Sequence, residues 1–337
     1  MHRFRLNLCT LATVLVLAAT AVACQVPVFR YALERWTPDR YEVIVLHAGP
    51  LTTQSQAAIE RLQSFPRQQF ANFDVHVAEV ATLRDERLLQ LWQQHSEQPR
   101  TDQPQPGPLM VVLYPRTAME VPDRLLSVTP LATHALQAQG LESLITSPVR
   151  QEVARRLSSG QSAVWIFVPS GDAAKDSVAL KTLTAEMAAN KSRLTLPTAE
   201  ELEIDPQVLA ANKLPLKIDF SVVTLDRQDP REAFLLQSLE QSELDLPPTE
   251  PLAFPVLGRG RVLYALVGKG IMPATIDTAC TFIVGPCSCQ VKNQNPGFDL
   301  LLSHDWESAT AGSMISSPLP DETAEPKLLT IPPGRSK

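Results

Sequence analysis

Residues 250–270 read EPLAFPVLGRGRVLYALVGKG, and this stretch decides the fold. Two apolar runs flank the glycines at positions 258 and 260, a pattern typical of two strands joined by a tight turn. Pro273 follows and marks the first turn of a helix. The apolar residues of that helix recur at helical spacing and form its inward face: Ile276, Ala279, Cys280 and Ile283. The stretch therefore predicts a hairpin followed by a helix.

The residues before this hairpin predict a strand, a helix and a second strand. AVWIFVPSGD (163–172) is an apolar run that ends in a turn, AAKDSVALKTLTAEMAAN (173–190) has helical spacing, and LKIDFSVVTL (216–225) alternates. Ser147 and Pro148 mark the start of a further helix that precedes them. Continuously apolar strands belong to sheets that helices cover on both faces, so this half is expected to be an α/β domain.

The first half repeats this order of elements without an obvious repeat of sequence. Its predicted strands are YEVIVLHAG (41–49), FDVHVAEV (73–80) and PLMVVLYP (108–115), with RLLSVTPL (124–131) as an edge strand; helical patterns fill 52–65 and 84–95. We expect an α/β protein of two domains, 24–146 and 147–312, each with a central mixed sheet and helices on both faces. Residues 313–337 lack periodicity and predict a disordered tail.

The overall composition is that of a folded globular protein. The 337 residues leave room for two domains, and 44% are hydrophobic and 20% charged. The formal net charge is −6, whereas a nucleic-acid-binding protein normally has a basic face. We therefore expect no nucleic-acid partner.

The N-terminal residues 1–23 have the pattern of a secretory signal. Arg3 and Arg5 precede an almost unbroken apolar run over 8–22, and small residues at 21–23 provide a cleavage context. The run is short for a membrane-spanning helix, which needs about 20 residues. The pattern predicts export; the alternative is an uncleaved membrane anchor.

Cys24 follows the predicted cleavage point directly. The segment AVAC (21–24) resembles the lipobox of bacterial lipoproteins, which implies that Cys24 is acylated and holds the protein at the membrane, facing the periplasm or the exterior. The alternative is simple cleavage, with Cys24 left as a thiol or a disulfide partner. Phe29, Leu33 and Trp36 then recur at helical spacing, so a helix with a buried stripe begins almost at once.

Residues 250–270 and the helix after them resemble the C-terminal part of a thioredoxin. The resemblance implies two thioredoxin-like domains, with Pro251 at the family's cis-proline position and Pro108 at the matching place in the first half. It also implies that 163–172 and 41–49 lead into the corners where that family places a Cys-x-x-Cys motif at a helix N-terminus, which lowers the thiol pKa. Neither corner contains a cysteine, and Asp172 would oppose a thiolate. The family's oxidoreductase activity therefore does not transfer to these corners.

Three cysteines lie close together near the C-terminus: Cys280, Cys287 and Cys289. One interpretation is a structural staple or a set of buried thiols, because Cys280 lies on an apolar helix face. A second is a redox centre formed by the Cys-x-Cys pair, and a third is a thiolate site for a soft metal such as Cu(I). The segment GPCSCQVKNQNPG (285–297) resembles a group of uncharacterised bacterial envelope proteins, which implies no activity.

No complete catalytic motif is present in the sequence. GRGR (258–261) and GKG (268–270) lack the spacing of a phosphate-binding loop, and they are interpreted as a hairpin turn and a strand end. We expect an exported, lipid-anchored protein that is not an enzyme, needs no cofactor and binds or assembles a partner in the bacterial envelope. The alternatives are a thiol-disulfide oxidoreductase that uses Cys287 and Cys289, and a Cu(I)-binding protein.

Overall fold

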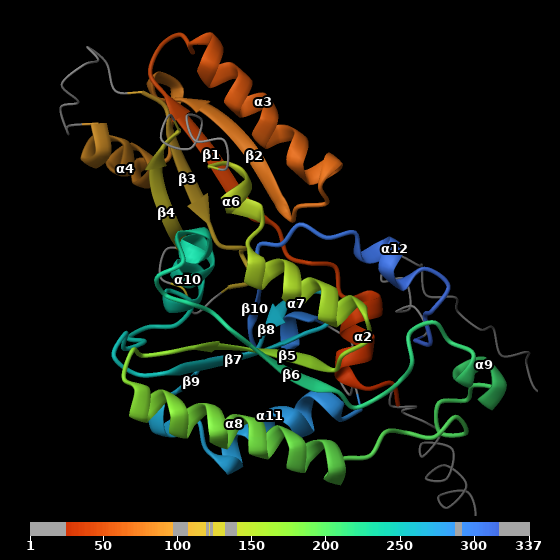
Figure 1. Ribbon diagram of the computed structural model, residues 1–337. Coiled ribbons are helices and arrows are strands. Elements are labelled where there is room, and N and C mark those ends of the chain that lie inside the picture. Colours follow the sequence, from red (N-terminus) through yellow and green to blue (C-terminus); the bar gives the residue numbers. More distant parts are fainter. Residues whose placement is uncertain are drawn as a thin grey trace, which may run out of the picture.

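The computed structural model describes residues 25–96, 107–118, 121, 124–131, 140–286 and 292–316. Two mixed sheets, each flanked by helices, form the body of the protein, which confirms the predicted α/β class (Figure 1). None of the helices in these ranges is both long and apolar enough to cross a membrane.

The first sheet has four strands in the order β2-β1-β3-β4. They are β1 (Tyr41–His47), β2 (Phe73–Glu79), β3 (Leu109–Leu113) and β4 (Leu125–Pro130). β1 pairs with β2 in parallel and with β3 antiparallel, and β4 pairs antiparallel with β3 at the edge, as its sequence predicts. A parallel pair needs a crossover connection, which α3 (Thr53–Gln68) provides.

Helices cover both faces of this sheet because its central strands are apolar on both sides. Val43 and Val45 pack on the face covered by α3, while Ile44 and Leu46 pack on the face covered by α4 (Glu86–Ser96). The side chains of β1 thus alternate between two buried layers.

The second sheet has the order β10-β8-β7-β5-β6. Its strands are β5 (Ala163–Val168), β6 (Phe220–Thr224), β7 (Leu252–Leu257), β8 (Arg261–Val262) and β10 (Phe298–Asp299), and β9 (Leu266–Val267) also pairs with β7. β5 and β6 are parallel, whereas β7 is antiparallel to β5. The order β8-β7-β5-β6 repeats the order β4-β3-β1-β2 of the first sheet.

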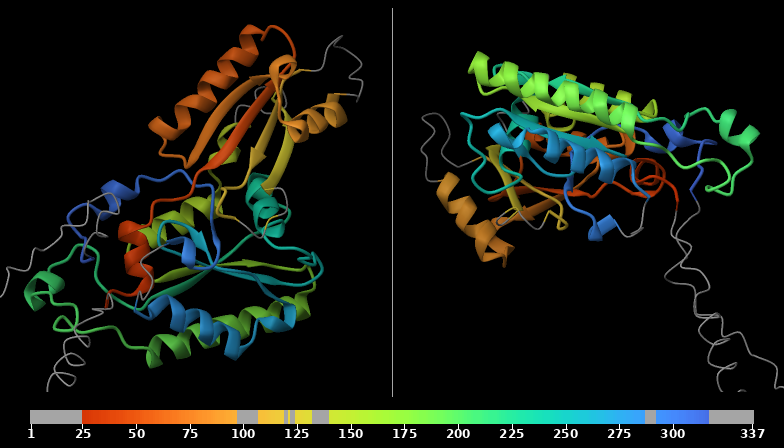
Figure 2. Two further views of the ribbon diagram at one scale, coloured as in Figure 1. Left: turned by 180° about the vertical axis from the view of Figure 1, so that it is seen from behind. Right: turned by 90° about the horizontal axis from the view of Figure 1, so that it is seen from below.

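The second sheet is also covered on both faces. Trp165 and Phe167 pack against α8 (Ala173–Arg193) and α11 (Pro273–Val284), and the alternate residues Val164 and Ile166 pack towards α7 (Pro148–Ser158) and α10 (Ala233–Glu240). Figure 1 shows α8 and α11 together below the sheet, with α7 and α10 above it. Figure 2 shows the same layers from behind and from below.

The hairpin at 250–270 differs from the prediction in one respect. Two strands joined at 258–260 were expected, but the second strand is divided into β8 and β9. The pairing with β7 shifts register by one residue between Val256↔Val262 and Ala253↔Leu266, and Pro255 of β7 has no N–H to donate. At the break the backbone N–H of Ala265 donates to the carboxylate of Glu243, at 2.6 Å. The side chain of Glu243 thus replaces one hydrogen bond of the ladder.

The N-terminal helix α2 (Val28–Arg35), which the sequence assigned to the first domain, packs against the second sheet. The guanidinium of Arg259 donates to the carbonyls of Leu33 and Glu34, at 2.8 and 3.0 Å. Gly258 has φ +59°, and a Cβ added there would lie 2.6 Å from the Cβ of Ala32. Glycine at the turn therefore permits the close approach of α2.

The two sheets share one continuous hydrophobic core, which includes Val43 of β1 and Val164 of β5. The chain after β10 lies between them: the side chain of Asn72 donates to Leu300 O, at 3.0 Å, and accepts from Leu302 N, at 2.8 Å. Residues 313–316 are ordered against α2, in contrast to the tail expected from 313 onwards. The rest of that tail, 317–337, and the signal at 1–23 lie outside the described residues.

Candidate functional site

At the corner between β5 and α8, carboxylates of the corner itself accept hydrogen bonds from the backbone N–H groups. The carboxylate of Asp172 accepts from the N–H groups of Ala174 and Lys175, at 2.9 and 3.2 Å, which makes Asp172 the N-cap of α8. The carboxylate of Asp176 accepts from Ser170 N at 2.8 Å and from Gly171 N at 3.1 Å. The amides that could stabilise a thiolate or another anion are thus already paired with carboxylates.

A lysine crosses the same corner. The ammonium group of Lys175 donates to Thr249 O, at 3.2 Å, and forms an ion pair with Glu250, at 2.5 Å. The residues directly before Pro251 are therefore engaged by a side chain of α8. No peptide bond among the described residues is cis, so the expectation of cis bonds before Pro251 and Pro108 is wrong. Both prolines nonetheless precede the strands β7 and β3, as the resemblance implied.

The corner between β1 and α3 is simpler. Thr52 caps α3 by accepting from Ser55 N, at 3.1 Å, and Nδ1 of His47 lies 2.9 Å from Gly49 O. Neither corner contains a sulfur atom. The two corners where the resemblance to thioredoxins implies a Cys-x-x-Cys motif hold helix caps instead.

Cys280 lies in the core between α8 and α11 and is fully buried. The pKa of its thiol is raised to about 12, chiefly by burial and to a smaller extent by Asp277, while Arg193 acts in the opposite direction. A thiol with a raised pKa is a poor nucleophile at neutral pH. Cys280 forms no disulfide with a described residue.

The other cysteines of the predicted sites, Cys24, Cys287 and Cys289, lie outside the described residues. Within the parts of the chain that the structure describes, no group of three or more His, Cys, Asp or Glu side chains is arranged to hold a metal ion. Of the three cysteines near the C-terminus, the structure therefore describes Cys280 alone, and it lies in the core.

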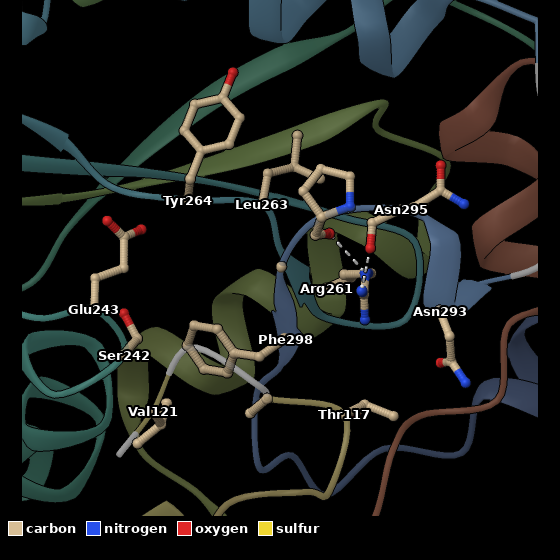
Figure 3. A pocket seen from close by; sticks show the side chains of 13 residues that line it. Thr117, Val121, Ser242, Glu243, Arg261, Leu263, Tyr264, Asn293, Asn295 and Phe298 are labelled. Carbon is tan, nitrogen blue, oxygen red and sulfur yellow. Dashed lines mark hydrogen bonds between the residues drawn. The ribbon is translucent and has the colours of Figure 1, made fainter.

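A pocket of about 390 Å³ lies at the junction of the two sheets, and we call it the junction pocket (Figure 3). Its walls come from the chain after β3, the chain after α10, the hairpin of β8, and the residues around β10: Thr117, Ala118, Val121, Ser242, Glu243, Arg261, Leu263, Tyr264, Asn293, Asn295, Pro296, Gly297 and Phe298. Phe298 stands near the middle of the view, with Tyr264 above it, Glu243 to the left and Asn293 to the right. The lining thus combines the ring of Phe298 with amide, hydroxyl and carboxylate groups.

Buried charges form one wall of the junction pocket. The guanidinium of Arg261 donates to Pro296 O, at 3.0 Å, and to Asn295 O, at 2.8 Å, and lies 3.4 Å from the carboxylate of Asp299. Lys292 forms ion pairs with Asp299 and, at 2.8 Å, with Asp39. Arg261 and Asp299 are both buried, and paired charges of this kind are the form in which a protein interior tolerates ionised groups.

The same network binds the first sheet to the second. The hydroxyl of Tyr41 donates to Asp299 O, at 2.8 Å, and the hydroxyl of Thr117 donates to the carboxylate of Asp39, at 2.5 Å. Burial raises the pKa of Tyr41, which keeps its hydroxyl protonated and able to donate. The wall of the pocket is therefore rigidly connected to both sheets.

Glu243 and the backbone of Tyr264 border the opposite side of the pocket, while the Tyr264 ring points away from the other lining side chains and packs against the core layer of α8 and α11 (Figure 3). Tyr264 is half-buried, and burial, assisted by Cys280, raises the pKa of its hydroxyl. The lining has no cysteine, histidine or lysine among the described residues, and the Thr117 hydroxyl in it is held by the carboxylate of Asp39. This arrangement can bind a ligand or a partner side chain.

The sequence reasoning missed this pocket. It interpreted GRGR as a hairpin turn, which is correct for 258–260, but Arg261 is a strand residue that makes buried ionic contacts. A cation between apolar strand residues, GRVL, was the available signal. Its partner Asp39 is more than two hundred residues away in the chain, so spacing alone does not reveal the pair.

No protein-family model matches this chain, and no curated protein matches it.

Proposed function

We propose that the protein is an exported, lipid-anchored and non-catalytic binding or assembly partner in the bacterial envelope. One observation carries this proposal: at the α8 corner, carboxylates occupy the helix N-terminal amides, and no sulfur is present. A thioredoxin-like scaffold in that state retains its shape but has no thiol at this corner to exchange electrons. Binding is the function that such a scaffold can still perform.

The junction pocket is the binding site that this function requires. Its volume, about 390 Å³, lies within the usual range of ligand sites, about 300–1,000 Å³. Its lining offers the aromatic ring of Phe298 beside polar groups, and aromatic residues are enriched at protein interfaces. The buried network around Arg261 keeps the wall fixed, so little ordering is needed on binding.

An insulin-reduction assay tests the non-catalytic part. The purified protein should show no turnover above the rate of dithiothreitol alone, because the corners lack sulfur and Cys280 is buried as a protonated thiol. Turnover that disappears in Cys287→Ser or Cys289→Ser would overturn the proposal in favour of the oxidoreductase.

Site-specific photo-crosslinking in living cells tests the binding part. A photoreactive phenylalanine analogue at Asn293, an exposed residue of the pocket lining, should give a discrete crosslinked species, which should weaken when Ala118→Trp fills the pocket. The same analogue at Val178, an exposed position on α8, is the matched control and should give none. Equal crosslinking at both positions would contradict a role for the junction pocket.

The anchor is tested by intact mass measurement of the protein from the membrane fraction. Cleavage before Cys24 with added acyl chains supports lipidation. A chain that retains residues 1–23, or an unmodified chain in the soluble fraction, contradicts it.

A further inference from the structure

Very little free chain separates Cys24 from the folded body. Gln25 is exposed, but Val26 and Val28 are already buried against the second half of the protein. Two residues of fully extended chain span at most about 7 Å. Any membrane attachment at or before Cys24 must therefore hold the body of the protein close to the bilayer surface.

The end of α11 lies beside this point. The N–H of Val28 donates to Gly285 O, at 2.9 Å, and Pro27 forms an isolated antiparallel bridge with Pro286. The start of α2 is thus fixed to the second half by its backbone, and it cannot extend to lengthen the tether without breaking these contacts.

Residues 313–316 lie against α2 and border the surface around its start. Arg30 and Glu34, a buried ion pair on α2, contact this segment from both sides of Met314: Arg30 donates to Ser313 O, at 2.5 Å, and Glu34 accepts from Ile315 N, at 3.0 Å. Met314 itself is 40% exposed. An exposed apolar side chain is therefore held beside the first two turns of α2.

We propose that the surface formed by the start of α2, the end of α11 and residues 313–316 lies against the lipid headgroups, and we call it the anchor face. This inference rests on the membrane attachment in the proposed function, and it holds for an acylated Cys24 and for an uncleaved anchor alike. The first sheet, which Figure 1 shows at the other end of the molecule from the start of α2, then projects away from the bilayer.

The short tether, and not adsorption, keeps the anchor face at the membrane. The chain that leads into α9 (Pro206–Ala210) carries exposed acidic side chains, Glu200, Glu201 and Asp205, and anionic headgroups repel them. The chain after α9 is joined to α2 through Leu214 O, which accepts from Arg30 at 2.9 Å. We therefore expect the protein to leave the vesicles once it is cut between its anchor and Val26.

Tryptophan fluorescence with a headgroup quencher tests the orientation. The four native tryptophans are all buried, so they contribute a common background. Met314→Trp places a probe on the anchor face, and Val77→Trp is a matched control on β2, because Val77 is 41% exposed and Met314 is 40% exposed. The full chain is purified from membranes and reconstituted in phosphatidylethanolamine–phosphatidylglycerol vesicles that contain a nitroxide-headgroup lipid.

The added emission of Met314→Trp should be mostly lost in these vesicles, and that of Val77→Trp should be retained. Phe282→Trp, a conservative aromatic exchange in the last turn of α11, is a second anchor-face probe should the first variant not fold. Equal quenching at both ends, or quenching of Val77→Trp alone, in membrane-attached protein overturns the anchor face but leaves the proposed function intact. Recovery of the protein only in the soluble fraction overturns both.

Discussion

The α8 corner and the junction of the two sheets both gather charged groups, but under opposite conditions. At the corner, Asp172 and Lys175 are exposed to solvent and satisfy groups within a few residues or at the neighbouring loop. At the junction, Arg261 and Asp299 are buried and connect segments from both halves of the chain. The same kinds of side chain therefore do different work.

Solvent access explains the difference. An exposed ion pair contributes little to stability because water and salt screen it. A buried pair is costly to assemble, but removing one partner leaves an uncompensated charge in the interior. The corner is therefore expected to tolerate substitution, whereas the junction is not, although a thioredoxin-like scaffold would suggest that the corner matters most.

Arg261→Ala is the strongest test of this contrast. It leaves the buried carboxylate of Asp299 with Lys292 as its remaining cation and removes two hydrogen bonds to the 295–296 backbone. The free energy of unfolding should fall by about 4 kcal/mol, measured by urea denaturation. Arg231→Ala, which breaks the exposed pair with Asp229, is the control and should leave the midpoint unchanged. Equal effects of the two variants would remove the contrast.

Two glycines allow the same comparison for the backbone. Gly171 at the corner and Gly258 at the hairpin turn beside α2 both have positive φ, +91° and +59°, but a Cβ at Gly171 meets nothing within 4 Å. Gly171→Ala should cost about 1 kcal/mol, from the backbone conformation alone. Gly258→Ala should cost about 3 kcal/mol, because its Cβ would also clash with Ala32 and displace α2. Thermal unfolding measured for both proteins decides whether packing of α2 adds to the backbone cost.

Local pattern was sufficient to predict most of the fold. Strands such as 41–47 and 163–168 are apolar at successive positions, and this signal needs no knowledge of distant residues. Two features depend on distant contacts and were not predictable in this way. At the division between β8 and β9 the register shifts and Ala265 bonds to Glu243, and the position of α2 depends on Gly258 and Arg259, more than two hundred residues later.

The features of the candidate site also fall into those that local sequence predicts and those that depend on distant contacts. The absence of sulfur from both corners could be recognised in the sequence, and so could Asp172 as a group unfavourable to a thiolate. The junction pocket could not, because its walls come from four separate stretches of chain, between Thr117 and Phe298. Its buried charges have partners that only the packing of the two sheets brings together.

Burial of the Cys280 thiol makes the free energy of unfolding depend on pH, which the exposed charged groups of the α8 corner are not expected to do to the same extent. Burial raises the pKa of the folded-state thiol from 9.0 to about 12, so its contribution to stability is fully present below pH 9 and is lost as the pH rises from 9 towards 12, where the unfolded chain releases the proton first. In this window the wild type should lose stability faster than Cys280→Ala, by up to about 1.4 kcal/mol per pH unit. Urea denaturation of both proteins at pH 8 and pH 10 measures the difference. Parallel pH profiles would show that the thiol is not buried in solution.

Of the four predictions, removal of the N-cap of α8 should have the smallest effect on stability. Asp172→Ala leaves the N–H groups of Ala174 and Lys175 to water, and the free energy of unfolding should fall by about 1 kcal/mol. Asp205→Ala is the matched control, because Asp205 caps α9 in the same way but α9 buries no residue, so its fraying should not change global unfolding. Insulin reduction should remain absent in Asp172→Ala, since freeing the amides supplies no nucleophile. Activity gained in that variant would mean that the aspartate suppresses a redox centre at the corner, and the corner would then be the more important of the two regions.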